Sequence, residues 1–177
     1  MSGERIGSLI GAIGGLVFIL VNAGGLPGAA PLVARCLGVA AFAFVVWYAV
    51  VRPRPGAVEA RPPTRRAMRV YWICVGAMAL AIPVGAAVVN NVLDAPELTV
   101  CWVVLVVGAH FLPFAKAFDA PVFAPLAWTL VGIAVVGGAL TLALDEQAAA
   151  WTAVLAGAAL LAYVALGSRP GRETRAA

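Results

Sequence analysis

Apolar and polar positions alternate along this chain in long blocks, not with the short periods of soluble helices or strands. Each apolar block approaches the roughly 20 residues that one bilayer crossing needs, and short polar segments separate the blocks. The pattern predicts an all-α, polytopic membrane bundle of six transmembrane helices in a single domain, residues 1–177. The expected spans are residues 6–26, 29–51, 70–93, 98–115, 122–144 and 148–167.

Composition agrees with this pattern. Of the 177 residues, 63% are hydrophobic and 11% are charged, whereas a soluble domain carries about a quarter charged residues. A water-soluble fold of this length could not bury so much apolar surface, so the lipid bilayer is the expected partner. No nucleic acid is expected despite the net charge of +4, because the basic residues lie between the apolar blocks, where orientation signals are found.

The longest polar segment, residues 52–69, is rich in proline and carries six arginines. Proline removes a helical hydrogen bond, so we expect a solvated loop. Basic clusters beside a span often bind anionic lipid headgroups. The alternative, which the sequence favours, is that the cluster only determines topology. The tail, residues 168–177, is likewise polar and basic.

The distribution of charge predicts the orientation. With the N-terminus inside, eleven of the twelve Lys and Arg residues fall on the cytoplasmic side, and the twelfth, Arg35, lies within a span. The outer connections then carry only acids: Asp94, Glu97, Asp145 and Glu146. By the positive-inside rule, both termini are expected in the cytoplasm of a multi-pass plasma-membrane protein.

Spans three to six suggest a repeated helical hairpin. Two tryptophan and glycine patterns recur: Glu97-x4-Trp102-x5-Gly108 matches Glu146-x4-Trp151-x5-Gly157, and Trp72-x3-Gly76 matches Trp128-x3-Gly132. Chance is the alternative, because interfacial Trp and packing Gly are common in membrane helices. Gly7, Gly11 and Gly15 form a separate row, which is expected to serve contacts within the bundle in preference to contacts between protomers.

One candidate site lies near the outer side. Arg35 sits roughly 9 Å along its helix from the outer end, and a charge there is costly unless it is paired or snorkels. It could pair with the outer acids and line a polar vestibule, a ligand or ion path, with three asparagines at similar depth. Those residues are Asn22, Asn90 and Asn91. The favoured alternative is that Arg35 reaches the outer headgroups.

A second candidate lies near the inner side, where His110 is at a depth comparable to Cys74, Tyr71 and Thr129. Histidine titrates near physiological pH, so it could carry a proton or contact a ligand on the same path. The favoured alternative is a packing histidine whose hydrogen bond goes to a backbone carbonyl or a hydroxyl group.

The sequence contains no catalytic motif and predicts no cofactor and no metal site. One histidine cannot build a histidine-rich centre, and the acids lie in connections or at span edges, which argues against carboxylate-driven proton pumping. Cys36, Cys74 and Cys101 lie in separate apolar blocks without CxxC spacing. They are expected to be small buried hydrophobes.

Three stretches carry a resemblance to a known group of proteins. They are GGLVFILVNAGGLP (Gly14–Pro27), VYW (Val70–Trp72) and CWVVLVVGAHF (Cys101–Phe111). They resemble uncharacterised small multi-span integral membrane proteins of high-GC Gram-positive bacteria. The resemblance implies a six-helix membrane protein and no particular activity.

Three functions follow, in order of preference. A non-enzymatic accessory or assembly protein, which would act with a membrane-protein partner or as a homo-oligomer, predicts no deep polar pocket. A small oligomeric transporter or channel predicts that Arg35, the asparagines and His110 converge on one path. A membrane-embedded enzyme acting on lipid or isoprenoid needs clustered acid, base or metal ligands, of which the sequence offers few.

Overall fold

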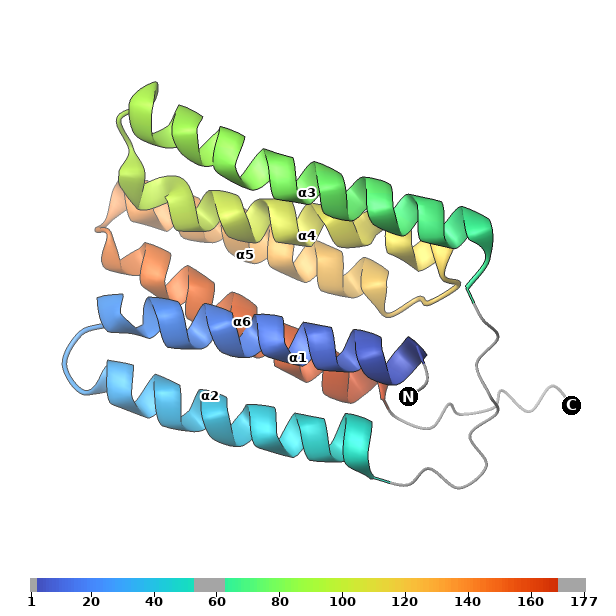
Figure 1. Cartoon of the computed structure of the whole chain (residues 1–177). Helices are drawn as coiled ribbons and strands as arrows, with labels where there is room; N and C mark the ends of the chain where they lie inside the picture. Colours follow the sequence, from blue (N-terminus) through green and yellow to red (C-terminus); the bar gives the residue numbers. More distant parts are fainter. Residues whose placement is uncertain (1–2, 53–62, 169–177) are drawn as a thin grey trace, which may run out of the picture.

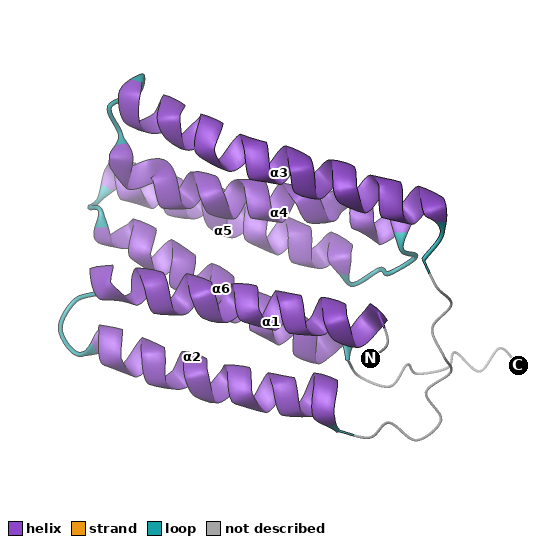
Figure 2. Cartoon of the chain, viewed as in Figure 1, coloured by secondary structure: helices purple, strands orange, loops and turns teal. Residues whose placement is uncertain are grey.

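The computed structural model describes residues 3–52 and 63–168. Within these ranges the chain forms six long helices and three short helical turns, with no strand (Figures 1 and 2). All six long helices are of sufficient length and apolarity to cross a membrane, which confirms the predicted all-α bundle of six transmembrane helices. They are α1 (Gly3–Asn22), α2 (Ala30–Val46), α3 (Arg65–Asn91), α4 (Thr99–Ala117), α5 (Phe123–Ala143) and α6 (Gln147–Gly167).

The order of the helices across the bundle differs from their order in the chain. Neighbours run α3, α4, α5, α6, α1, α2, and α6 also contacts α4 and α2 (Figure 1). Half of the α6 span is buried inside the protein, against 6% of the α3 span. Helix α6 is therefore the centre of the bundle, and α3 forms one edge.

Buried aliphatic side chains from three helices form the main core. Val104 of α4 and Leu130 of α5 are fully buried, and Leu160 of α6 packs against them. A second cluster joins α1, α2 and α6 through Ile19, Val45 and Leu161. Both clusters include residues of α6, which explains its central place.

Glycines allow a close helix crossing between α1 and α6. A Cβ atom on Gly15 would lie 2.8 Å from the carbonyl oxygen of Gly157, and one on Gly157 would lie 2.5 Å from that of Gly15. Such distances are possible only because neither residue has a side chain. A Cβ on Gly11 would face Val164 of α6, whereas a Cβ on Gly7 would meet nothing within 4 Å. The glycine row therefore packs inside the bundle at two of its three positions.

Helix α3 is attached to the bundle through Trp102 of α4. The indole Nε1 donates a hydrogen bond of 3.0 Å to the carbonyl of Ala81, and the ring covers Gly85 so closely that any Cβ there would overlap it. Pro83 lies between these two contacts, inside the helix. Small residues around the proline thus form a notch that the tryptophan fills.

The predicted basic loop, residues 52–69, is shorter than expected at its C-terminal end, because α3 begins at Arg65. The Thr64 hydroxyl accepts a hydrogen bond of 3.1 Å from the backbone N–H of Ala67 and caps the helix. The prolines precede this cap, so they do not prevent Arg65, Arg66 and Arg69 from being helical. Residues 53–62 and the tail from residue 169 lie outside the described part of the chain, so the predictions for them remain open.

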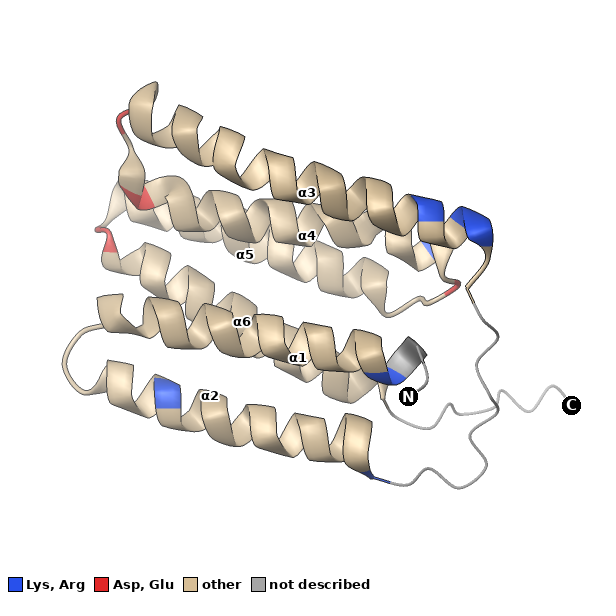
Figure 3. Cartoon of the chain, viewed as in Figure 1, with Lys and Arg blue, Asp and Glu red and all other residues tan. Residues whose placement is uncertain are grey.

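Charges separate to the two ends of the bundle (Figure 3). The α3–α4 turn and the α5–α6 turn hold Asp94, Glu97, Asp145 and Glu146, and we call this end the acidic end. The opposite, basic end includes the start of α3 with its three arginines and the end of α4 with Lys116, together with Asp119. The spans between the two ends are almost free of charge.

Candidate functional site

The polar residues predicted to line an outer vestibule lie at the acidic end but at opposite edges of the bundle. Asn22 ends α1 and Arg35 is in the second turn of α2, whereas Asn90 and Asn91 end α3. Helices α4, α5 and α6 lie between these two edges (Figure 1). The structure therefore places Asn22 and Arg35 on the neighbouring helices α1 and α2 and both Asn90 and Asn91 on α3, and it does not bring the two pairs together.

Each asparagine forms a hydrogen bond close to its own position. The Nδ2 groups of Asn22 and Asn91 donate to the carbonyls of Phe18 and Ala87, at 2.9 and 2.8 Å, one turn earlier in the same helix. Asn90 Oδ1 accepts a hydrogen bond of 2.9 Å from the Thr99 hydroxyl and so ties the end of α3 to the start of α4. These bonds favour local structural roles for the asparagines.

Arg35 is exposed on α2 and extends toward the turn between α1 and α2. A Cβ atom on Gly24 in that turn would lie 3.4 Å from one guanidinium nitrogen of Arg35. The guanidinium therefore reaches back to the acidic end of the bundle, which is the geometry of a snorkelling arginine.

The four predicted acidic partners lie in the two turns at the acidic end. Asp94 has a positive φ of 48° and closes the turn after α3, a conformation that aspartate tolerates better than most residues. Asp145 Oδ1 accepts a hydrogen bond of 2.8 Å from the backbone N–H of Gln147 at the start of α6. Asp94, Asp145 and Glu146 are exposed, and Glu97 is half-buried.

His110 lies in the half of α4 nearer the basic end and is half-buried. Its Nδ1 is 2.5 Å from the carbonyl oxygen of Val107 in the same helix. A carbonyl only accepts, so Nδ1 is the donor in this hydrogen bond. The histidine thus has the backbone partner expected of a packing residue.

The His110 ring belongs to an aromatic cluster that was not predicted from the sequence. Phe114 is buried at its centre, with the rings of His110 and Tyr71 centred 5.4 and 5.8 Å away. Phe111, Phe118 and Phe123 complete the cluster, which joins α3, α4 and α5. The spacing of Phe111, Phe114 and Phe118 on one helical face was the signal that could have indicated it.

Of the other two residues predicted near His110, Thr129 has a partner outside the aromatic cluster. Thr129 of α5 shares a hydrogen bond of 3.0 Å with the Tyr163 hydroxyl of α6. Cys74 is half-buried on α3. The structure therefore groups Tyr71 with His110 through Phe114, while Thr129 joins a different pair of helices.

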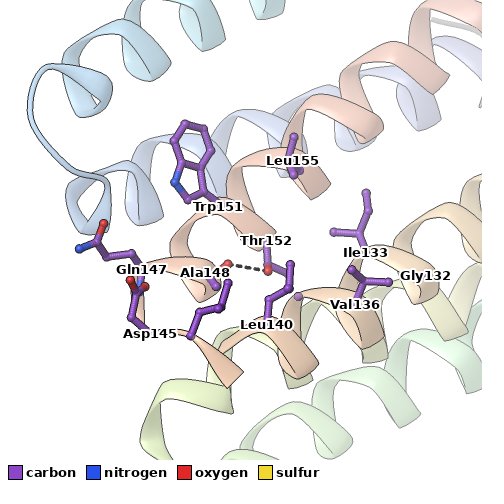
Figure 4. Close-up of a pocket in the computed structure, with 12 residues that line it drawn as sticks. Gly132, Ile133, Val136, Leu140, Asp145, Gln147, Ala148, Trp151, Thr152 and Leu155 are labelled. Atoms are coloured by element: carbon purple, nitrogen blue, oxygen red, sulfur yellow. Dashed lines mark hydrogen bonds between the residues drawn. The ribbon is translucent and has the colours of Figure 1, made fainter. Parts of the chain in front are cut away.

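Two apolar grooves lie on either side of α6. Groove A, between α5 and α6, has a volume of about 580 Å³ (Figure 4). Groove B, between α2 and α6, has a volume of about 460 Å³. Trp151 lines both. The hairpin repeat singled out Trp151 in the sequence, but neither groove was predicted, because a groove depends on which helices are neighbours.

Within residues 3–52 and 63–168, no three His, Cys, Asp or Glu side chains gather in a way that could hold a metal ion. Comparison with known proteins finds no matching family model, no matching curated protein and no matching solved structure. Six helices that are long and apolar enough to cross a membrane make the chain a multi-pass membrane protein. The geometry of its polar groups and grooves is the remaining evidence about its function.

Proposed function

We propose that this chain is a non-enzymatic integral membrane protein that acts as an accessory or assembly partner of another membrane protein. We place it in the plasma membrane with both termini in the cytoplasm. One observation carries the proposal: the polar side chains of the spans are occupied locally and do not converge. Asn22, Asn91 and His110 all bind carbonyls of their own helices.

A transporter or channel, the second candidate, needs a continuous polar path across the bilayer. His110 lies toward the basic end and the asparagines lie at the acidic end. Between these depths the centre of the bundle is filled by fully buried aliphatic side chains, including Val104 and Leu130. This packing favours a closed structural core over a conduit.

A membrane-embedded enzyme, the third candidate, needs acid, base or metal ligands in one place. In the described part of the chain the acids lie in turns at the bundle ends, and His110 is surrounded by aromatic rings. That distribution gives enzymatic chemistry the least support of the three.

Helix α3 offers the surface best suited to a partner. It packs mainly on α4 and turns a broad apolar face outward. Trp72, Leu80 and Val84 are exposed on this face, and Gly76 has open space around it. A small residue amid large apolar ones permits the close approach that drives helix association in lipid.

Photo-crosslinking in native membranes tests this proposal. A photoreactive residue at Trp72, Leu80 or Val84 should yield one covalent adduct of defined protein mass, and Gly76→Leu should abolish it by blocking close approach. The control positions are Val135 and Val136, which are exposed on α5 and should label lipid only. Protein adducts at the α5 positions alone, or none at any position, would contradict the assembly role.

Flux through proteoliposomes distinguishes the second candidate. We expect ion and small-solute flux to equal that of protein-free vesicles. Flux above that level, abolished by Arg35→Gln or His110→Phe in variants that still fold, would establish a transporter in place of the accessory protein.

The orientation rests on the charge separation between the two ends and has its own test. In a cysteine-free background, a membrane-impermeant maleimide added to intact cells should label Glu146→Cys at the acidic end. Lys116→Cys, at the basic end, should react only after the cells are opened. The reverse pattern would place the termini outside.

A further inference from the structure

The two grooves beside α6 lie on either side of Trp151, which lines both. Helix α6 is the most buried span, so the part of its surface that remains exposed lies in a recess between α5 and α2. Gly132, Val136 and Leu155 line groove A, and Leu37, Ala41 and Ala158 line groove B. Trp151, which is 43% exposed, is the wall that the two grooves share.

The matching hairpin α3–α4 shows why groove A is open. There Trp102 lies over Gly85 and fills the space between the two helices. In the hairpin α5–α6, the residue after Trp151 makes the close contact instead: the Thr152 side chain occupies the place of a Cβ on Gly137. Successive residues on a helix point about 100° apart, so Trp151 is turned away from α5 and leaves the groove unfilled.

Groove A has one polar end and one apolar end (Figure 4). Asp145, Gln147 and Trp151 lie together at the acidic end of the bundle, whereas Gly132 and Ile133 lie at the far end of the groove. An indole with an apolar body and one N–H donor is typical of the headgroup boundary. Groove B also begins near the acidic end, at Ala30, the first residue of α2.

The charges at the polar end of groove A determine which lipid headgroup would be favoured there. Asp145 is exposed and uses one carboxylate oxygen as a cap for α6, which leaves the other oxygen available. Its neighbour Glu146 is also acidic, and none of the described residues that line the grooves is basic. Arg35 lies between Ala34 and Leu37 of groove B and turns its guanidinium toward Gly24 in the α1–α2 turn. A cationic group is favoured beside the Asp145 and Glu146 carboxylates.

We propose that grooves A and B bind the two acyl chains of one phospholipid with an amine headgroup, phosphatidylethanolamine, from the leaflet at the acidic end. Each chain occupies one groove, and Trp151 stands between them. The lipid ammonium group lies against the Asp145 carboxylate, and Gln147 and the Trp151 N–H face the glycerol region. This site goes beyond the assembly role proposed above and does not depend on it.

Native mass spectrometry of the full-length protein in detergent tests the site. The probes are phosphatidylethanolamine and phosphatidylglycerol with identical dioleoyl chains. We expect one retained phosphatidylethanolamine molecule and a preference of about fivefold over phosphatidylglycerol, the upper end for an exposed ion pair. Equal retention of the two lipids, or a dimer that carries no lipid, would overturn the proposal.

Two matched glycine variants locate the acyl chains. Gly132 lines groove A, and Gly76 stands at the matching place of the Trp-x3-Gly pattern in α3; a Cβ at either position would meet nothing within 4 Å. Gly132→Leu should lower lipid retention on the order of tenfold by filling the groove, whereas Gly76→Leu should leave it unchanged. Equal retention in both variants would exclude groove A.

Two matched acid variants locate the headgroup. Asp145→Asn keeps the oxygen that caps α6 but removes the charge, so it should abolish the preference for phosphatidylethanolamine while a lipid remains bound. Glu146→Gln, one residue further, should retain most of the preference. An unchanged preference in Asp145→Asn would refute the role of this carboxylate, and the wild-type comparison decides the site even if a variant fails to fold.

Discussion

Replacing Gly15 with alanine is expected to force α1 and α6 apart at their close crossing. The added methyl would lie 2.8 Å from the Gly157 carbonyl oxygen, and a Cβ contact needs at least 3.4 Å to be an ordinary one. Leu160 and Leu161 also lie within 3.2 Å of the new atom. The contact is with backbone, so no side-chain rotation can relieve it, and α1 must move away from α6.

The expected magnitude combines two opposing effects. Overpacking costs about 1–3 kcal/mol, and alanine recovers about 1 kcal/mol of helix propensity relative to glycine. We therefore expect Gly15→Ala to lower the free energy of unfolding by up to about 2 kcal/mol. Gly14→Ala is the matched control, because a Cβ on Gly14 meets nothing within 4 Å, and it should be neutral or slightly stabilising.

Equilibrium unfolding in mixed micelles of rising dodecyl sulfate fraction, followed by circular dichroism, measures both variants. Gly157→Ala should also destabilise, since its methyl would meet the Gly15 carbonyl oxygen. The double variant should lose less stability than the sum of the losses in the two single variants, because a single displacement of α1 relieves both contacts. Equal stability of Gly15→Ala and Gly14→Ala, or strict additivity in the double variant, would refute the reasoning.

Three further predictions use the same unfolding assay or hydrogen exchange. Trp102→Phe removes the hydrogen bond to α3 and should lower the free energy of unfolding by about 1 kcal/mol. Gly85→Val should lower it further, because the valine side chain would expel the indole ring. If both variants were as stable as the wild type, the Trp102 ring would not hold α3 in place. Thr64→Ala should cost about 1 kcal/mol and speed amide exchange in the first turn of α3 alone. In a double-mutant cycle, Thr129→Val and Tyr163→Phe should couple by about 0.6 kcal/mol, whereas a coupling of zero would show that their hydroxyls do not interact.

Much of the fold was predictable because bilayer thickness and backbone hydrogen bonding restrict what an apolar block can form. A block of this length must cross as a helix, since lipid offers no partner for free backbone groups. The start of α3 was harder to predict. Proline-rich composition suggested a loop to residue 69, but the last proline is Pro63, and Thr64 caps a helix that begins at Arg65.

For the candidate site residues, the sequence predicts the position along each helix but not which way each side chain points. Distance along a helix follows from the rise per residue, so Arg35 and the asparagines were correctly expected near one end of the bundle. Whether they face one another depends on which helices are neighbours. The separation of Asn22 from Asn90, and the aromatic ring cluster around Phe114, both depend on that arrangement.

By itself, the sequence determined that the chain is a membrane protein, how many times it crosses, and at which ends its charges lie. These properties depend on whether each residue is more stable in lipid or in water, and that preference can be assigned residue by residue from the sequence. Only the tertiary structure decided that α6 is central, that Gly15 meets Gly157, and that two grooves flank Trp151. Lipid solvates an apolar helix face about as well as a neighbouring helix does. Hydropathy therefore does not indicate which helices are neighbours. The neighbours are decided by where small side chains let two helices approach closely.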